Sequence, residues 1–394
     1  MLDEEDTMGI LSNTVSLFQY RLHGVRPEGD FEAWIGRQLM KNQFMGIDKT
    51  AEESSTGWVV FDNHQSSDFT DPTTFVRDHY LVFSLRRDQR KVPSTLVKNL
   101  LLAECDKWLS ERPAISRVPS RRRLEMKENI HASLIARSLP VPSSWDVVWD
   151  TRSDVVSITS ISARALDLIE DEVSRTFEGF LLEPIHPISR AEAVLVKSLH
   201  GALERANQAP SKDVLLQIKK NRWLGWEFLL WLMYRTSAGV STYEVTQDGP
   251  AERDERFLSY LHDRFVLCSE GEDGIRKSSI IGPQRDFAEA RRAIQDGKNI
   301  TEALLYFEKD SMKWKISLKA DLFAFGSFTC PPVTIERDEI TDPIQEREAV
   351  FFERMNLIET GLQLFESVYA AFLSQRLQGG WQDTHREISA WLNQ

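Results

Sequence analysis

Hydrophobic and polar positions alternate along the first half of the chain in patterns that predict both strands and helices. Apolar residues at every second position indicate a strand, whereas apolar residues spaced by three or four indicate a helix. The elements expected before residue 90 are a strand at 15–22, a helix with Phe31, Ile35 and Leu39, a short strand at 57–60 and an apolar strand at 79–85. Strands and helices alternate from residue 12 to residue 187, with hairpins as well as crossovers, which favours an α+β fold over a doubly wound sheet.

Two helices are expected between residues 93 and 137, after a basic turn at 86–91. The first should start at Pro93-Ser94, because a serine hydroxyl can accept hydrogen bonds from the free amides of a first turn. The second should start at Ser120. The apolar residues expected to be buried are Leu96, Val97, Leu100, Leu101 and Trp108 in the first helix and Met126, Ile130 and Leu134 in the second.

The second half of the chain continues the mixture of helices and antiparallel strands. Its expected elements are a hairpin at 145–159, a helix from Ser162, a strand at 180–185, helices over 188–234, strands at 265–268 and 279–281, and a helix at 287–294. A hairpin follows in which Trp314, Ile316 and Leu318 face the core, while Lys313, Lys315 and Lys319 point the other way.

The last long helix carries apolar residues in a 4-3 alternation over three heptads, which predicts a seam that packs against a partner helix. The seam residues are Phe351, Met355, Ile358, Leu362, Phe365, Tyr369 and Phe372. Two partners are possible, a helix of the same chain or a second subunit, and in the second case Phe365 and Tyr369 are candidate dimer contacts.

These elements group into four segments. Residues 1–80 and 141–187 form a central α+β domain, 81–140 a basic helical tip, 188–335 a second α+β base module with a helical insertion, and 336–394 an acidic linker with the C-terminal helix. The expected subunit is therefore α+β, elongated and built from several modules of antiparallel sheets and helices.

The charge of the chain is divided unevenly. The chain carries −12 overall with an isoelectric point near 5.3, which argues against a protein that coats nucleic acid with its whole surface. Residues 81–140, however, hold 13 Lys and Arg against 6 acids, a balance of +7, so that the remaining residues carry −19. A local positive field of this kind can attract a polyanion even when the whole molecule repels it. The candidate DNA-binding residues in it are Arg86, Arg87, Arg90, Lys91, Lys98, Arg117, Arg121, Arg122, Arg123, Lys127 and Arg137.

Three of these arginines, Arg121 to Arg123, fall in the first turn of the second helix. The helix dipole is positive there, so each cation is unfavourable by roughly 0.3–1 kcal/mol. Local stability does not explain them, whereas a phosphate-rich partner does, as would a helix that starts later. The alternative is that the two helices and their loop are simply solvated.

Other chemistry is not indicated. The three cysteines, Cys105, Cys268 and Cys330, are far apart and are expected to be buried thiols in a reducing cytosol. The acidic N-terminus lacks the features of a secretory signal, and the most apolar run, residues 223–234, is too short to span a membrane. No phosphate loop, zinc-protease motif or nucleophile elbow occurs, although a site assembled from distant residues stays open. No catalytic residue, metal or cofactor is predicted, and the chain is expected not to be an enzyme.

The order of several stretches resembles the recombination-associated protein RdgC family, a bacterial DNA-binding family. The stretches are Gly57-Trp58-Val59, the passage from Leu81 through Pro93-Ser94 to Lys98, the passage from Leu134-Ile135-Ala136-Arg137 to Trp149-Asp150 with its following hairpin, and Gly297-Lys298 with Thr301 to Leu304. The run from Leu224 to Leu229 and the C-terminal helix resemble longer members of the family. The resemblance covers nearly the whole chain and rests on the order of the motifs rather than on any one of them.

The resemblance implies a homodimer that closes into a ring around duplex DNA, binds it without reading sequence, and restrains RecA-type strand exchange, in the cytoplasm and nucleoid. Where the ring-closing tip of the family has an aromatic residue, this chain has Leu139, which is the candidate dimer contact there. The chain is also longer than the commonest members, mostly between Pro187 and Asp263. A competing hypothesis is a protein-interaction scaffold whose basic helices bind an acidic protein partner.

Overall fold

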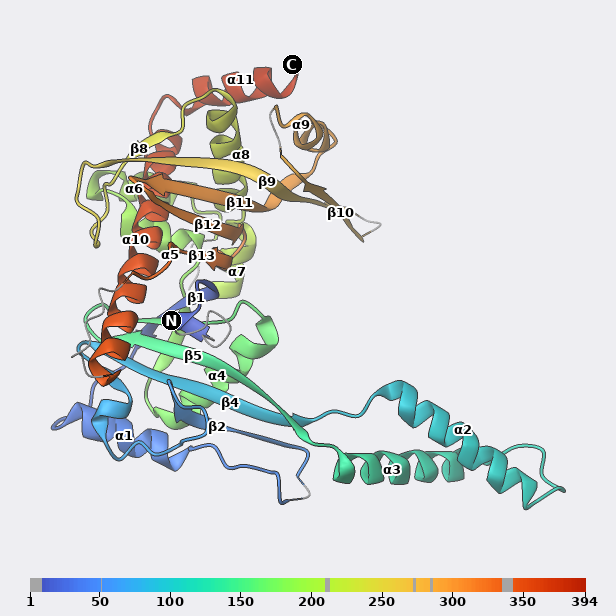
Figure 1. Ribbon diagram of the computed structural model, residues 1–394. Helices are drawn as coiled ribbons and strands as arrows, with labels where there is room; N and C mark the ends of the chain where they lie inside the picture. Colours follow the sequence, from blue (N-terminus) through green and yellow to red (C-terminus); the bar gives the residue numbers. More distant parts are fainter. Residues whose placement is uncertain (1–8, 51, 210–212, 272–273, 284–285, 335–342) are drawn as a thin grey trace. The chain divides into compact units, whose positions relative to one another are not determined.

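The computed structural model describes residues 9–50, 52–209, 213–271, 274–283, 286–334 and 343–394 (Figure 1). The chain divides into two compact units. The larger unit contains residues 1–24, 149–170 and 180–394, and the smaller unit contains residues 25–148 and 171–179. Both units combine helices with antiparallel strands, which confirms the α+β prediction.

The smaller unit is a short antiparallel sheet with three helices. Its strands are β2 (Ser54–Val60), β3 (Val76–Arg77), β4 (Tyr80–Arg90) and β5 (Pro140–Asp150), and its helices are α1 (Phe31–Lys41), α2 (Ser94–Ser110) and α3 (Ser120–Arg137). The strand order is β5-β4-β2, with β3 paired to β4. Trp58 on β2 is fully buried, and its ring nitrogen donates to Thr176 Oγ1 at 2.8 Å. The helices α2 and α3 are inserted between the two neighbouring strands β4 and β5.

The larger unit is built around a longer antiparallel sheet in the order β10-β9-β11-β12-β13-β1-β6, with β7 paired to β1 and β8 to β9. These strands are β1 (Thr14–His23), β6 (Val155–Ile158), β7 (Leu181–Pro184), β8 (Thr242–Glu244), β9 (Arg256–Gly271), β10 (Gly274–Ile281), β11 (Asn299–Lys309), β12 (Met312–Lys319) and β13 (Ala324–Thr329). Along β12, Trp314, Ile316 and Leu318 are fully buried and the intervening lysines are not, as the alternation predicted.

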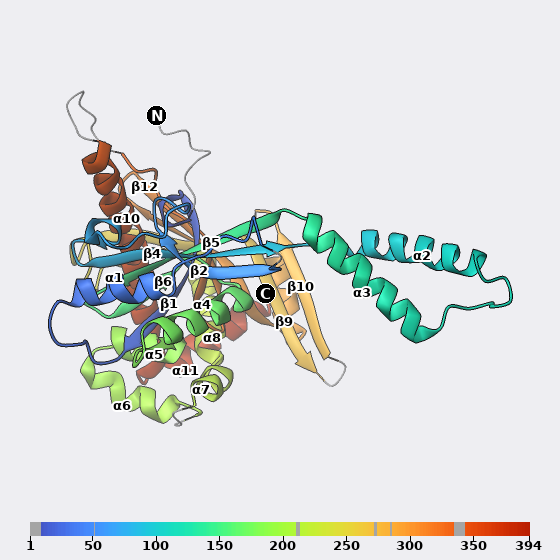
Figure 2. The same cartoon turned by 90° about the horizontal axis from the view of Figure 1, so that it is seen from below.

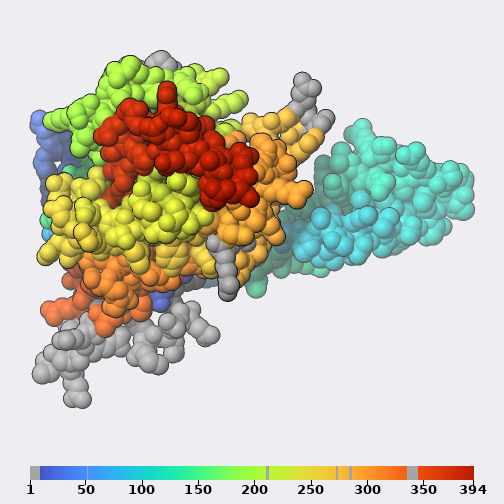
Figure 3. All heavy atoms as spheres, turned by 90° about the horizontal axis from the view of Figure 1, so that it is seen from above, coloured from blue at the N-terminus to red at the C-terminus, as the bar shows by residue number. Residues whose placement is uncertain are grey.

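The helices that belong wholly or mainly to the larger unit follow in chain order. They are α4 (Ala163–Thr176), α5 (Pro187–Val194), α6 (Lys197–Ala206), α7 (Val214–Lys220), α8 (Trp223–Ser237), α9 (Ala288–Gln295), α10 (Pro343–Leu377) and α11 (Trp381–Leu392). Short 3-10 turns lie at Gly9–Leu11 and Pro72–Thr74. Helix α8 packs closely against the chain after β12, where a side chain at Gly225 would meet the Ala320 carbonyl oxygen at 2.1 Å. Helix α11, red in Figure 3, lies on the surface of this unit and contacts α8 and α9.

The long helix α10 finds its partners within the larger unit. All seven seam residues are buried, and Phe365 and Tyr369 are 0% exposed. The Phe365 ring lies 5.9 Å from Phe228 on α8 and 5.1 Å from Phe325 on β13, measured between ring centroids. The assignment of Phe365 and Tyr369 to a dimer contact is therefore corrected, because these side chains already fill the core of their own chain and have no surface to offer a second one.

Several local expectations are also corrected. The basic residues 86–90 are not a turn but the last part of β4, which runs to Arg90. Helix α2 begins at Ser94 with Pro93 as its N-cap, and no side chain caps it. A second C-terminal helix, α11, follows Gly380, whereas one C-terminal helix was expected. The acidic linker predicted from residue 336 falls mostly on 335–342, outside the described residues.

The cysteines are free, but only one of them is buried. Cys330 is buried, and burial raises the pKa of its thiol to about 11. Cys105 and Cys268 are half-buried, so the expectation of three buried thiols is correct only for Cys330.

Candidate nucleic-acid interface

The basic segment folds as a helical hairpin in which α2 and α3 pack mainly on each other (Figure 2). Its small core consists of Leu101, Val118 and Met126, with Trp108 and Ile130 packed against them. The predicted buried stripe is therefore correct at Val97 and Leu101, which are 6% and 8% exposed. It is wrong at Leu96 and Leu100, which are 42% and 40% exposed, because one neighbouring helix can cover only a narrow face of α2.

Helix α3 begins at Ser120, so Arg121, Arg122 and Arg123 do occupy its first turn. Glu125 forms ion pairs with two of them, at 3.7 Å to Arg121 and 3.0 Å to Arg122. These pairs are solvent-exposed and each contributes only about 0–1 kcal/mol. For Arg121 and Arg122, these ion pairs partly offset the unfavourable interaction with the helix dipole. Because α3 begins at Ser120, the alternative of a helix that starts later is excluded.

Five of the predicted cations on this hairpin are exposed and form no ion pair with any described residue, namely Lys98, Arg117, Arg123, Lys127 and Arg137. Lys98 lies on α2, Arg117 in the loop between the helices, and the other three on α3. Exposed cations without acidic partners are the groups that can neutralise phosphates of a polyanion. Together with Lys91, which is exposed just beyond β4, these five residues are the part of the predicted set that the fold leaves free for a ligand.

The predicted residues on β4 have a different role. Arg86 makes a bidentate contact with Asp88, at 2.8 and 2.9 Å, and stacks on the Phe44 ring at 4.5 Å. Its side chain is only 12% exposed. Arg87 is half-buried, whereas Lys91, just beyond the strand, is exposed. We therefore remove Arg86 from the candidate site, because its charge is already paired inside the unit.

Arg90 is the second correction, since it is 8% exposed and binds backbone carbonyls on both sides. Its guanidinium donates to the carbonyls of Ile47 at 2.9 Å and Thr50 at 3.2 Å, in the loop after α1. It also donates to the carbonyl of Ser138, at the end of α3. Arg90 thus connects the hairpin to the sheet and has no free donor face for DNA.

We expect Arg90→Met to lower the free energy of unfolding of the smaller unit by about 2–3 kcal/mol, since several buried carbonyls lose a charged donor. Urea unfolding followed by tryptophan fluorescence measures this change. Lys91→Met, one residue along and exposed, is the control and should change stability by less than about 0.5 kcal/mol. Equal stability of the two variants would contradict a structural role for Arg90.

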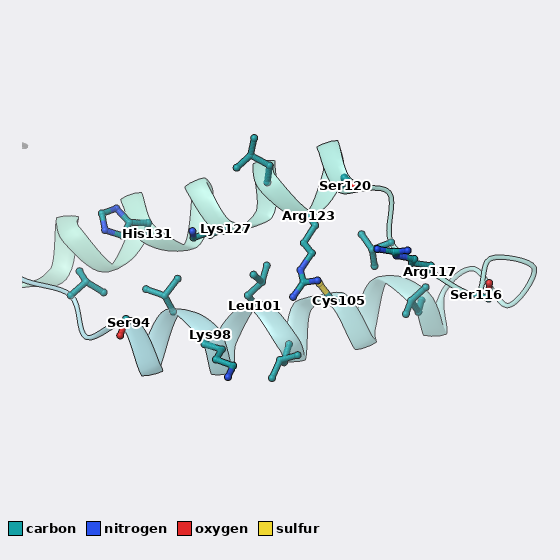
Figure 4. A pocket seen from close by; sticks show the side chains of 16 residues that line it. Ser94, Lys98, Leu101, Cys105, Ser116, Arg117, Ser120, Arg123, Lys127 and His131 are labelled. Carbon is teal, nitrogen blue, oxygen red and sulfur yellow. The ribbon is translucent and has the colours of Figure 1, made fainter. Parts of the chain in front are cut away.

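A groove of about 810 Å³ runs between α2 and α3 (Figure 4). Its lining is apolar along Val97, Leu101, Leu102 and Leu124, and no acidic residue takes part in it. Arg123 extends from α3 toward α2, next to Cys105. The remaining cations of the lining are Lys98, Arg117 and Lys127, and His131 also lines the groove. The sequence predicted the cations but not the apolar lining of the groove. The lining could have been inferred from α2, which has more leucines than one neighbouring helix can cover.

No group of three or more His, Cys, Asp and Glu side chains that could hold a metal ion occurs among the described residues. None of the described helices is long and apolar enough to cross a membrane.

Comparison with known proteins gives one family. A family model described as "Putative exonuclease, RdgC" matches residues 16–217, which is just over half of the chain and includes the whole α2–α3 hairpin. The match does not extend to the stretches at 224–229 and 297–304, on which the resemblance drawn from the sequence also relied. No curated protein matches the chain.

Proposed function

Because the chain belongs to the RdgC family, we propose that it acts in DNA recombination by binding double-stranded DNA without reading its sequence. The observation that carries this proposal is that five of the predicted cations on the α2–α3 hairpin are exposed and in no ion pair with a described residue, in a chain whose net charge is −12. An acidic protein that concentrates free cations on one inserted element is suited to bind a polyanion there and to repel it elsewhere.

Binding through phosphates suits these cations better than base reading. Sequence is read by side chains that enter a groove together and meet base edges in a fixed geometry. Here the cations come from two helices and a loop, and no Asn or Gln interleaves with Arg121 to Arg123 to contact adenine. We therefore expect similar affinity for duplexes of any sequence.

Salt dependence tests the proposal directly. Affinity for a random duplex should fall linearly in a plot of log K against log salt concentration, with a slope of about 0.9 for each phosphate neutralised. Five contacts would give a slope of about 4.5. Fluorescence anisotropy with two labelled duplexes of unrelated sequence measures both the slope and the sequence preference. Absence of duplex binding at 50 mM salt would contradict the proposal.

We further propose a binding role rather than catalysis, despite the exonuclease in the description of the family. The reason is that the hairpin offers cations and apolar side chains, which suit binding and not the hydrolysis of a phosphodiester. After incubation with the protein and Mg²⁺, the labelled duplex should keep its full length on a denaturing gel, and shortening from its ends would contradict this part of the proposal.

The proposed assembly is a homodimer that closes into a ring around duplex DNA in the nucleoid and restrains RecA-dependent strand exchange. Leu139, between α3 and β5, supports a contact near the hairpin, because it is 84% exposed and is the most exposed leucine of the described chain. Burying so exposed an apolar side chain against a partner is favourable, because it removes apolar surface from water.

We expect Leu139→Asp to weaken subunit association by roughly 10- to 100-fold, as the loss of about 1.5–3 kcal/mol of apolar burial implies. Light scattering at several protein concentrations measures the association. Leu215→Asp on α7, where the leucine is 79% exposed, is the matched control and should leave association unchanged. A wild type that stays monomeric at all concentrations yet binds duplex tightly would remove the ring from the proposal.

A further inference from the structure

The apolar part of the groove between α2 and α3 is not accounted for by DNA. Leu102 and Leu124 line it and are 47% and 55% exposed. A phosphate backbone offers these side chains no apolar surface, so duplex binding through the cations would leave them in water. The groove therefore carries a second recognition feature, which the proposed DNA-binding function does not use.

The shape of the hairpin indicates which kind of ligand would cover these leucines. Two helices alone enclose only the small core around Leu101, and helices of this kind usually bury such residues in bundles of three or more. Helix α2 is 17 residues long, or about 25 Å, so the groove can accept a partner helix of about four turns. An amphipathic helix laid along the groove would cover Leu102 and Leu124 and complete a three-helix arrangement.

The charge of the groove indicates which face such a helix would present. Lys98, Arg117, Arg123 and Lys127 surround the apolar lining without any acidic residue among them. A second copy of the hairpin would bring the same cations to the same place and be repelled. A helix with acidic residues beside its apolar stripe matches both parts of the groove.

We propose that the α2–α3 groove is a docking site for an acidic amphipathic helix of a partner protein. Leucine-type anchors of that helix contact Leu102 and Leu124, and its carboxylates pair with the four cations of the groove. The site is independent of whether the chain binds DNA, but the two ligands share these cations. Peptide and duplex therefore compete for the hairpin.

The test uses the full chain and a fluorescein-labelled 18-residue peptide with leucines on one helical face and glutamates elsewhere. The control peptide has the same composition in scrambled order. We expect the amphipathic peptide to bind at least 10-fold more tightly than the scrambled one in an anisotropy titration. Equal binding of the two would overturn the proposal, because charge alone would then explain the interaction.

Two double variants separate the groove from the rest of the hairpin. Leu102→Gln with Leu124→Gln should weaken peptide binding at least 10-fold and leave duplex binding within twofold, since no charge changes. Leu96→Gln with Leu100→Gln removes two leucines of α2 that do not line the groove, and should leave peptide binding unchanged. Equal loss in both double variants would overturn the assignment to the groove.

Two other occupants give different results. A hairpin that covers its groove with a second copy would show self-association that is lost with Leu102→Gln and Leu124→Gln and no preference for the peptide. A lipid-binding groove would bind phosphatidylglycerol vesicles and not the peptide. Either result would overturn the proposal, and neither depends on the outcome for duplex DNA.

Discussion

Removing the four groove cations should remove most of the salt-dependent part of duplex binding. The variant replaces Lys98, Arg117, Arg123 and Lys127 with Gln. At about 0.9 per contact, four phosphate contacts contribute about 3.6 to the salt slope, so between 50 and 200 mM salt the wild type should lose roughly 100-fold more affinity than the variant. The variant should also bind every duplex more weakly at 50 mM salt and show a flatter salt dependence, as anisotropy titrations at several salt concentrations would show.

The matched control removes the same charge from another surface. Lys197, Arg205, Lys219 and Lys220 lie exposed on α6 and α7 and can likewise be replaced with Gln. This control should change affinity by less than about threefold, because none of the four residues lies on the hairpin. If both variants lost affinity equally, binding would follow net charge, and if the first variant bound like the wild type, the hairpin would be only a solvated surface. If the first variant lost affinity only for duplexes of some sequences, the hairpin would be reading bases.

The second large effect concerns α10. Phe365→Ala should lower the free energy of unfolding by about 3–5 kcal/mol, because a fully buried ring between Phe228, Phe323 and Phe325 leaves a cavity. Urea unfolding measures the loss. Phe352→Ala on the same helix is the control, since that ring is 36% exposed, and should cost less than about 1.5 kcal/mol.

Light scattering of the same variants separates a core residue from an interface residue. Phe365→Ala should keep the oligomeric state of the wild type wherever it remains folded, because its ring contacts only its own chain. A variant that unfolded like the wild type but dissociated would show instead that the seam of α10 joins two subunits.

The sequence predicted the elements whose apolar pattern is local. The alternation along β12 placed Trp314, Ile316 and Leu318 in the core correctly, because each strand position faces one side of the sheet regardless of what covers it. The start of α3 at Ser120 was also predicted correctly. The 4-3 pattern of α10 predicted a buried seam but not its partner, since a helix of the same chain and a subunit leave the same pattern.

The errors arose where distant residues decide the role of a charge. Arg86 and Arg90 look like part of an exposed basic turn when only neighbours in sequence are considered. Their partners are Asp88, Phe44 and the carbonyls of Ile47, Thr50 and Ser138, most of which lie some 40 residues away. A cation that folding has already paired cannot be told from a free one by its position in the chain, so the predicted site contained both kinds.

The place of the hairpin between β4 and β5 has a consequence for how the chain can vary. The two strands are neighbours in the sheet, so the chain leaves and returns at almost the same point, and Arg90 holds that point together. Whole helical turns can be gained or lost from α2 and α3 in parallel without shifting the pairing of either strand. The length of the hairpin and the residues on its ligand-binding face can therefore change during evolution while the supporting sheet stays the same.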